Sequence, residues 1–139
     1  MSQENVELHY RVIDALNRRD LDAVLAHMDR DVQAVSRIVV IEGGYHGHEG
    51  TRRWWESLLD AFPDFTVEAV EVRELGNVTV AGLRTRGHGA TSDAPFDTAV
   101  WQAAEWRHGK CIRWRMFDSQ DEALEAVGLS EQDAHADSS

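Results

Sequence analysis

The sequence predicts a single α+β domain in which an antiparallel sheet curls around a few helices. Two helical patterns open the chain, and a third follows a short strand. From residue 65 onward the pattern changes to four strands separated by tight turns. Because the sheet must bury one face and the helices are few, we expect the sheet to close around them as a cone. The predicted domain covers residues 1–129, and we expect the acidic segment 130–139 to be disordered.

The first two helices are predicted from their caps and apolar spacing. Ser2 can cap a helix over residues 3–18, and Asp20 can cap a second helix over residues 21–28. We expect one stripe of the first helix, with two apolar residues beside it, to face the interior. Three residues of the second helix are expected to face the interior as well. These are Val6, Tyr10, Ile13 and Asn17, then Val12 and Leu16 beside them, and Val24, Leu25 and Met28 on the second helix.

A strand and a third helix follow. Residues 31–35 begin a strand, and the apolar run 38–41 precedes Gly43-Gly44, which favours a hairpin or a bulge nearby. Gly47 and Gly50 bracket the start of the third helix, which Pro63 ends after Phe62.

The second half of the chain has the pattern of an antiparallel meander. Strands are predicted over residues 65–75, 78–86, 96–107 and 111–118. Gly76-Asn77 and His108-Gly109 are tight-turn pairs that suit hairpins. Ser119 and Glu122 form a capping-box pair for a last helix, which Gly128 ends.

The composition limits the partners of the domain. Its 139 residues are 42% hydrophobic and 28% charged, which suits one globular core. A net charge of -11 repels phosphate groups, so we expect no nucleic-acid partner and no membrane partner. Cys111 is the single cysteine, so no intrachain disulfide can form. With no signal-peptide pattern and no apolar run near the roughly 20 residues that span a bilayer, we expect a cytoplasmic protein.

Four segments resemble a known family in order and spacing. They read ALNRRDLDAVLAHMDRDV (residues 15–32), GHEG (47–50), WRHGKCIRW (106–114) and EALEAVGL (122–129). On these segments the chain resembles the SnoaL-like branch of the nuclear transport factor 2-like superfamily over about residues 4–129. The resemblance implies a cone with a deep apolar pocket, and a homodimer packed through the outer face of the sheet. Because this fold hosts unrelated chemistries, it does not by itself name a function.

Strand parity predicts which side chains enter the cone, since alternate residues share a face. On the strand 96–107 the even-numbered set is mostly apolar and is expected inside. On the strand from Val78 the polar end of the even set, Arg84, Arg86 and His88, can line the mouth of the cone or face solvent. The inward sets are Phe96, Thr98, Val100, Gln102, Ala104 and Trp106 on one strand and Ile112, Trp114, Met116 and Asp118 on the last, with Arg113 and Arg115 outward.

Two polar residues are the catalytic candidates. Asp118 shares a face with Trp114 and Met116, and an apolar wall favours proton transfer by raising a carboxyl pKa. The alternative for Asp118 is that it helps to cap the last helix. Gln102 can donate a hydrogen bond to a ligand carbonyl, or its amide can satisfy a buried polar group of the protein.

The remaining candidates form the walls of the pocket. Core packing is the alternative for each of these aromatic and apolar side chains. The predicted substrate-binding residues are Tyr10, Met28, Trp54, Val100, Trp106, Trp114 and Met116.

No cofactor is expected. His46, His48 and Glu49 lie close together, but no third ligand follows at a metal-site spacing, so we expect His48 and Glu49 to cap the third helix instead. No organic cofactor is expected either, because the chain has no glycine-rich phosphate loop.

Templates from the resembling family can be compared position by position. Ketosteroid isomerase-like enzymes would place their acid-base groups near Ser36, Val12 and Gln102, and none of these is an acid or a tyrosine. Limonene epoxide hydrolase-like enzymes use Arg-x-Asp, where this chain has Arg84-Thr85-Arg86, and a last-strand aspartate near Met116. Only the single aspartate of SnoaL-like cyclases has a candidate here, Asp118.

Two classes of function follow from these observations. The first is recognition of a small hydrophobic molecule, with acid-base turnover of the isomerase, cyclase, dehydratase or epoxide hydrolase type as its extension. The second is a non-catalytic ligand-binding module or dimerisation scaffold. An enzyme requires Asp118 inside the cone, a binding module requires an enclosed apolar cavity, and a scaffold requires that large side chains fill the cone.

Overall fold

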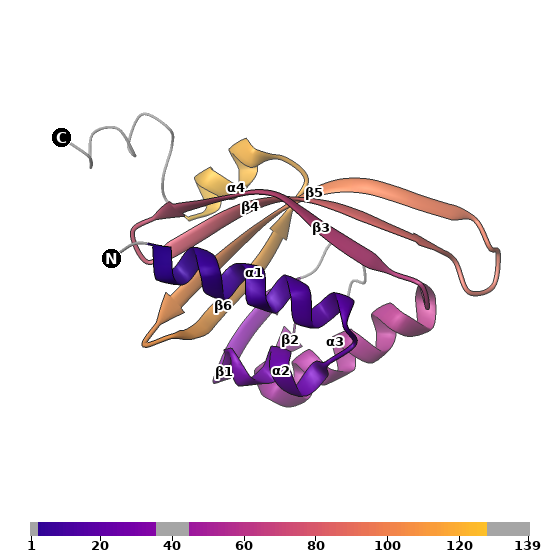
Figure 1. The fold of residues 1–139 in the computed structure, drawn as a ribbon, viewed down its shortest axis with the longest axis horizontal. Helices are drawn as coiled ribbons and strands as arrows, with labels where there is room; N and C mark the ends of the chain where they lie inside the picture. Colours follow the sequence, from indigo (N-terminus) through magenta and orange to yellow (C-terminus); the bar gives the residue numbers. More distant parts are fainter. Residues whose placement is uncertain (1–2, 36–44, 128–139) are drawn as a thin grey trace.

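The computed structural model describes residues 3–35 and 45–127. Three helices lie against one face of a curled sheet, and a fourth lies on the other face (Figure 1). No helix in the described ranges is long and apolar enough to cross a membrane. The elements are α1 Gln3–Asn17, α2 Leu21–Ala26, β1 Met28–Val35, β2 Tyr45–His46, α3 Gly47–Ala61, β3 Thr66–Leu75, β4 Val78–His88, β5 Pro95–Arg107, β6 Lys110–Phe117 and α4 Gln120–Ala126.

The six strands form one mixed sheet in the order β2-β1-β6-β5-β4-β3. The meander β3 to β6 is antiparallel as predicted, and β1 joins it in parallel beside β6. Register shifts interrupt the β3–β4 ladder between Ala69 and Glu71 and the β5–β6 ladder between Glu105 and Trp106. Such bulges bend a sheet and increase its twist, so they help to curl it over the helices. The predicted α+β class is confirmed.

Local sequence signals set the helix ends. Asp20 caps α2 by accepting the Ala23 N–H at 3.1 Å, and Ser119 caps α4 by accepting the Glu122 N–H at 3.2 Å, both as predicted. The second helix ends at Ala26 rather than at Met28, because Met28 already pairs with Cys111 in the sheet. The predicted cap Ser2, the apolar run 38–41, Gly43-Gly44, Gly128 and the tail 130–139 lie outside the described residues.

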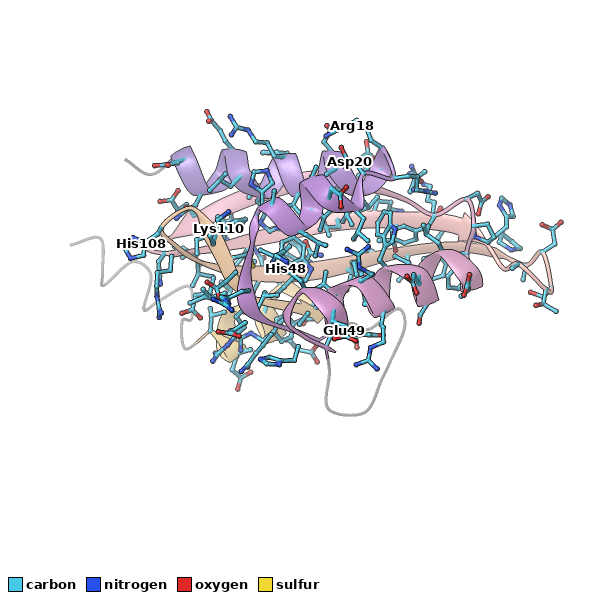
Figure 2. The ribbon with its side chains drawn as sticks, turned by 90° about the horizontal axis from the view of Figure 1, so that it is seen from below. Arg18, Asp20, His48, Glu49, His108 and Lys110 are labelled. Carbon is cyan, nitrogen blue, oxygen red and sulfur yellow. The ribbon has the colours of Figure 1, made fainter. Side chains whose placement is uncertain are left out.

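The two predicted hairpin turns have the expected backbone. Gly76 has φ +68°, and His108 and Gly109 have φ +53° and +76°. Positive φ at the first central residue, as at Gly76, or at both, as at His108 and Gly109, gives a turn whose twist matches that of the flanking strands. Figure 2 shows His108 and Lys110 at the tip of the β5–β6 hairpin, beside the start of β6.

The sheet separates two apolar clusters. The larger one lies between the sheet and α1, α2 and α3, and the smaller one joins β4 and β5 to α4 through Val78, Val80, Ala103 and Leu124. From Val100 to Trp106 the even residues of β5 face the larger cluster or are buried beside it, as parity predicted. On β4 the odd residues Ala81 and Leu83 face it instead, so the even set lies on the other face of the sheet.

The polar end of β4 lies on solvent, which was one of the two placements considered. Arg84 forms an ion pair with Asp97 at 2.6 Å, and Arg86 lies 3.7 Å from Glu68 and 3.8 Å from Asp97. All these side chains are about half exposed or more, so these pairs contribute little to stability.

The break between α1 and α2 is fastened to the start of β3. Asn17 donates its amide to the Val67 carbonyl at 2.7 Å and accepts the Val67 N–H at 2.9 Å. Arg19 takes a left-handed conformation, φ +61°, and donates to the carbonyls of Pro63 at 3.1 Å and Phe65 at 2.7 Å. These bonds set the position of α1 across the sheet.

We expect Asn17→Ala to lower the free energy of unfolding by about 1 to 2 kcal/mol, because both backbone groups of Val67 lose their partner. Urea unfolding followed by circular dichroism measures the change. Asn17→Asp keeps the accepting oxygen and loses the donor, so its loss should be smaller. Equal stability of all three proteins would show that this bridge does not position α1.

Candidate functional site

An apolar pocket lies inside the cone, between the helices and the β1–β6 side of the sheet. Its volume is about 20 Å³, measured as the space open to the centre of a water molecule, which suits one water. No charged side chain lines it among the described residues. The lining residues are Val12, Leu16, Val24, Met28, Val32, Ala34, Thr51, Trp54, Trp114 and Met116.

Four of the seven predicted substrate-binding residues line this pocket: Met28, Trp54, Trp114 and Met116. Val100 and Trp106 are each 3% exposed and belong to the surrounding core without lining the pocket. Their part in binding stays a prediction.

Tyr10 requires a correction of its placement. It is 45% exposed, although the sequence placed it on the inner stripe of the first helix. The buried stripe of α1 is instead His9, Val12, Ile13 and Leu16, which has the same helical spacing turned by about one residue. The prediction was wrong because it followed apolar side chains. His9 is polar and was therefore left out of the buried stripe, whereas Tyr10 has an aromatic ring and was included.

Asp118 also differs from its expected inward placement. It is exposed, because β6 ends at Phe117 and the chain turns there toward α4. Its backbone N–H donates to the Glu122 carboxylate at 3.1 Å, while the Ser119 hydroxyl accepts the Glu122 N–H. This arrangement corresponds to the alternative in which Asp118 belongs to the start of the last helix. Its acid-base role stays a prediction, and the exposed carboxyl lies outside the pocket lining.

Gln102 lies in a buried polar network behind the pocket. It is 2% exposed and accepts a hydrogen bond from Nε2 of His9 at 3.0 Å. Nδ1 of His9 therefore carries no proton and accepts one from the Thr79 hydroxyl at 2.7 Å. The Thr79 oxygen in turn accepts the indole N–H of Trp106 at 2.8 Å. Gln102 thus satisfies a buried group of the protein, which was the alternative to ligand binding.

The sequence analysis missed His9 and Thr79, which form the centre of this network. Both side chains are fully buried, and the His9 ring packs 5.1 Å from the ring of Trp114 on the pocket wall. Burial lowers the pKa of His9 from 6.5 to about 4, and its bond to Gln102 opposes the shift. Protonation would also place a proton on Nδ1 of His9, so Nδ1 could no longer accept the Thr79 hydroxyl proton. The ring is therefore neutral at physiological pH.

The histidines considered for a metal site serve other contacts. His48 does not cap α3 as expected: its Nε2 lies 2.9 Å from the Met28 carbonyl, which joins the start of α3 to β1 (Figure 2). The side chain of His46 is exposed. Across the described ranges, no group of three or more His, Cys, Asp or Glu side chains could hold a metal ion.

A second histidine contact lies outside the pocket lining, at the turn end of the β4–β5 hairpin. His88 is bonded through Nδ1 and through its backbone N–H to the Asp64 carboxylate, each at 2.7 Å. The bond to Asp64 raises the pKa of His88. Together with the packing of Phe62 on Phe96 at 4.9 Å between ring centroids, this contact holds the hairpin against the end of α3.

The polar part of the pocket wall comes from α3. The Thr51 hydroxyl donates to the Gly47 carbonyl at 2.8 Å, one turn earlier in the helix. The indole N–H of Trp54 is buried and has no hydrogen-bond partner among the residues that the structure describes. Among the other lining side chains, only Trp114 carries a polar atom, its indole nitrogen. The pocket can therefore hold a neutral apolar group against β1, β6 and α1, and a polar atom against α3.

The buried His9 predicts that stability falls as the pH falls from about 6.5 to about 4. Over this range the unfolded chain binds a proton at His9 and the folded protein does not, so protonation favours unfolding. The expected contribution is about 3 kcal/mol, as the shift of the pKa implies. Urea unfolding at a series of pH values measures it.

The matched comparison is His9→Gln, which removes this titration and leaves all other groups unchanged. Its stability should vary less with pH than that of the parent between pH 7 and pH 4. Parallel curves for the two proteins would contradict a neutral, buried His9.

Comparison with known proteins agrees with this fold. The family model of the SnoaL-like domain matches residues 10–114, which is more than half of the chain. No curated protein matches the chain in sequence.

Among solved structures, a putative SnoaL-like polyketide cyclase from Jannaschia sp. CCS1 is 20% identical, with a TM-score of 0.75 over 91% of this chain and 90% of that one. An uncharacterised cystatin-fold protein from Novosphingobium aromaticivorans is 24% identical, with a TM-score of 0.67 over 84% and 98%. A ketosteroid isomerase-like fold protein from Catenulispora acidiphila is 15% identical, with a TM-score of 0.73 over 89% and 94%. At these identities the likeness concerns the fold.

The curled sheet over three helices and the match of the family model lead to one conclusion. The chain belongs to the SnoaL-like domain family.

Proposed function

We propose that the protein binds a small, neutral, largely apolar molecule in the pocket inside the cone. This proposal rests on one observation, that the side chains lining the pocket are uncharged and mostly apolar. Of its ten lining residues, only Thr51, Trp54 and Trp114 carry a side-chain hydrogen-bonding group of nitrogen or oxygen, and none carries a charge. A charged ligand would lose its hydration there without gaining a partner of opposite charge.

Two proteins of similar fold were crystallised with small molecules. The Catenulispora acidiphila protein was crystallised in complex with trimethylamine, and TerC, which is 17% identical with a TM-score of 0.71, was co-crystallised with polyporic acid. These ligands belong to those proteins. They support the class of function proposed here, which is the binding of a small molecule.

Binding requires movement of the pocket wall, since a volume of about 20 Å³ admits one water and not an organic molecule. Two methionines line this wall, Met28 on β1 and Met116 on β6. Methionine is unbranched and changes rotamer readily, so these side chains are the ones that can make room. The proposal therefore includes an induced enlargement of the pocket.

The exposed position of Asp118 favours binding without turnover at that carboxyl. An acid-base reaction would need a proton-transferring group beside the ligand. Asp118→Asn tests this part of the proposal: we expect unchanged ligand affinity, measured by thermal shift. Loss of product formation from a bound ketone or epoxide in this variant would instead assign turnover to Asp118.

Ala34→Phe is expected to abolish ligand binding, because it adds a ring to the wall of a pocket that has little free volume. Binding is measured as stabilisation of the folded protein by a panel of small ketones, epoxides and aromatic hydrocarbons. At a ligand concentration of about 100 times the Kd, the parent should gain about 3 kcal/mol of stability.

Ala90→Leu is the control, since Ala90 is exposed at the far end of the β4–β5 hairpin. It should respond to ligands as the parent does. A panel that stabilises Ala34→Phe as much as the parent would place the ligand elsewhere.

The small pocket also favours a second function, a dimerising scaffold whose cone is filled by side chains. We propose that two copies pack through the outer face of the sheet, on the part that α4 leaves uncovered. Val70 is 69% exposed there, and the ring of Trp101 lies over Gly82 on the same face. Arg115, which was predicted to point outward from the sheet, donates to the Ala126 carbonyl of α4 at 3.2 Å. The proposed interface is therefore centred on β3, β4 and β5.

Ala99→Arg is expected to convert the dimer to a monomer, because it adds a charge to the hollow formed with Val70 and Trp101. Light scattering during size-exclusion chromatography gives the mass. Thr98→Arg, one residue earlier on the opposite face of β5, should leave the dimer intact. A monomeric parent, or a dimeric Ala99→Arg variant, would contradict this interface.

A further inference from the structure

One indole group in the pocket wall has an unsatisfied hydrogen-bonding capacity. The Trp54 side chain is 8% exposed, and its Nε1–H has no acceptor among the described residues. Buried N–H groups in folded proteins are nearly always paired. Trp106 follows this rule, since its indole N–H donates to Thr79. Trp54 is an exception that needs a physical explanation.

The ring of Trp54 is held in place by its neighbours. Tyr45 packs edge-on against it with the ring centroids 6.5 Å apart and the planes at 70°, and Trp55 packs at 6.5 Å and 52°. All three rings are buried. A fixed ring has a fixed N–H direction, so the donor is preorganised for a partner that arrives later.

The hydroxyl of Thr51, a second polar group of the wall, cannot donate a hydrogen bond to a ligand. Thr51 lies one helical turn before Trp54, and its hydroxyl proton is already donated to the Gly47 carbonyl. It can only accept a further hydrogen bond. Trp114 brings a second indole N–H to the wall from β6, but within the described lining only the Trp54 N–H is both fully buried and without an acceptor.

We propose that Trp54 selects the ligand by donating its indole N–H to an acceptor oxygen of a neutral, otherwise apolar molecule. This inference rests on the proposed binding function and specifies its ligand class. Ketones, ethers and epoxides have such an oxygen, whereas hydrocarbons of the same shape lack it. A hydrocarbon leaves the Trp54 N–H unpaired in the complex, so the acceptor-bearing molecule binds more tightly.

The test uses cyclohexanone and methylenecyclohexane, which have nearly the same size and differ in the acceptor oxygen. The protein is labelled with ¹⁵N, and its indole N–H signals are followed during titration with each compound. The chain has five tryptophans, and Trp54→Phe identifies the signal of Trp54 by its absence. We expect cyclohexanone to shift the Trp54 indole proton downfield. The hydrocarbon should shift signals of the pocket wall without this downfield change.

The affinities give an independent measurement. Trp54→Phe keeps an aromatic ring and removes the donor, so it should weaken cyclohexanone binding about five- to tenfold relative to methylenecyclohexane. Trp101→Phe is the control, because Trp101 packs against the smaller cluster on the outer face of the sheet and does not line the pocket. Its preference for the ketone should equal that of the parent. If Trp54→Phe does not fold, Trp→Phe variants at the other four tryptophans assign their own signals and leave that of Trp54, and the titration of the parent then decides.

The outcomes separate this inference from the function on which it rests. If both compounds shift pocket signals but the parent shows no preference for the ketone and no downfield shift at Trp54, the selection by Trp54 is overturned and binding stands. If neither compound perturbs the pocket, the proposed binding function is overturned, and this inference with it.

Discussion

The structure depends on how α1 is fastened to the concave face of the sheet. His9 on α1 joins Thr79 on β4 and Gln102 on β5 through hydrogen bonds of 2.7 and 3.0 Å, and Trp106 completes the network from β5. Every member is almost fully buried. Because a buried polar group is costly without its partner, this network admits one position of the helix across the strands. That position brings the apolar residues of α1 to the wall of the pocket.

The interior of the cone is thus divided into two regions of different chemistry. The network of neutral hydrogen-bonding groups lies toward β4 and β5, and the apolar pocket lies toward β1 and β6. Trp114 separates them, since its ring packs on His9 and also lines the pocket. The protein therefore satisfies the buried polar groups of this network internally and leaves the pocket largely apolar, with Thr51 and Trp54 of α3 and the indole of Trp114 as its polar side chains. This division favours binding of a neutral molecule over acid-base chemistry in the pocket.

Much of the fold follows from local signals in the sequence, because caps, turns and alternation act over a few residues. Asp20, Ser119 and the turn pairs were placed correctly, and so was the inner face of β5. The errors concern the phase of α1, where a polar residue occupies the buried stripe, and the end of β6, where a one-residue difference exposes Asp118. The His9 bonds span 70 and 93 residues of sequence, so no local pattern predicts them.

The proposed function requires that the apolar pocket open to admit a small neutral guest. Xenon tests it most directly, since this atom enters apolar cavities without needing any polar contact. With ¹³C-labelled methionine methyl groups, the signals of Met28 and Met116 in the wall should shift as the xenon pressure rises. Saturable shifts confined to the two wall methionines are the predicted result. Unchanged methyl signals at several bar of xenon would show that the cone is filled, and the binding function would be contradicted.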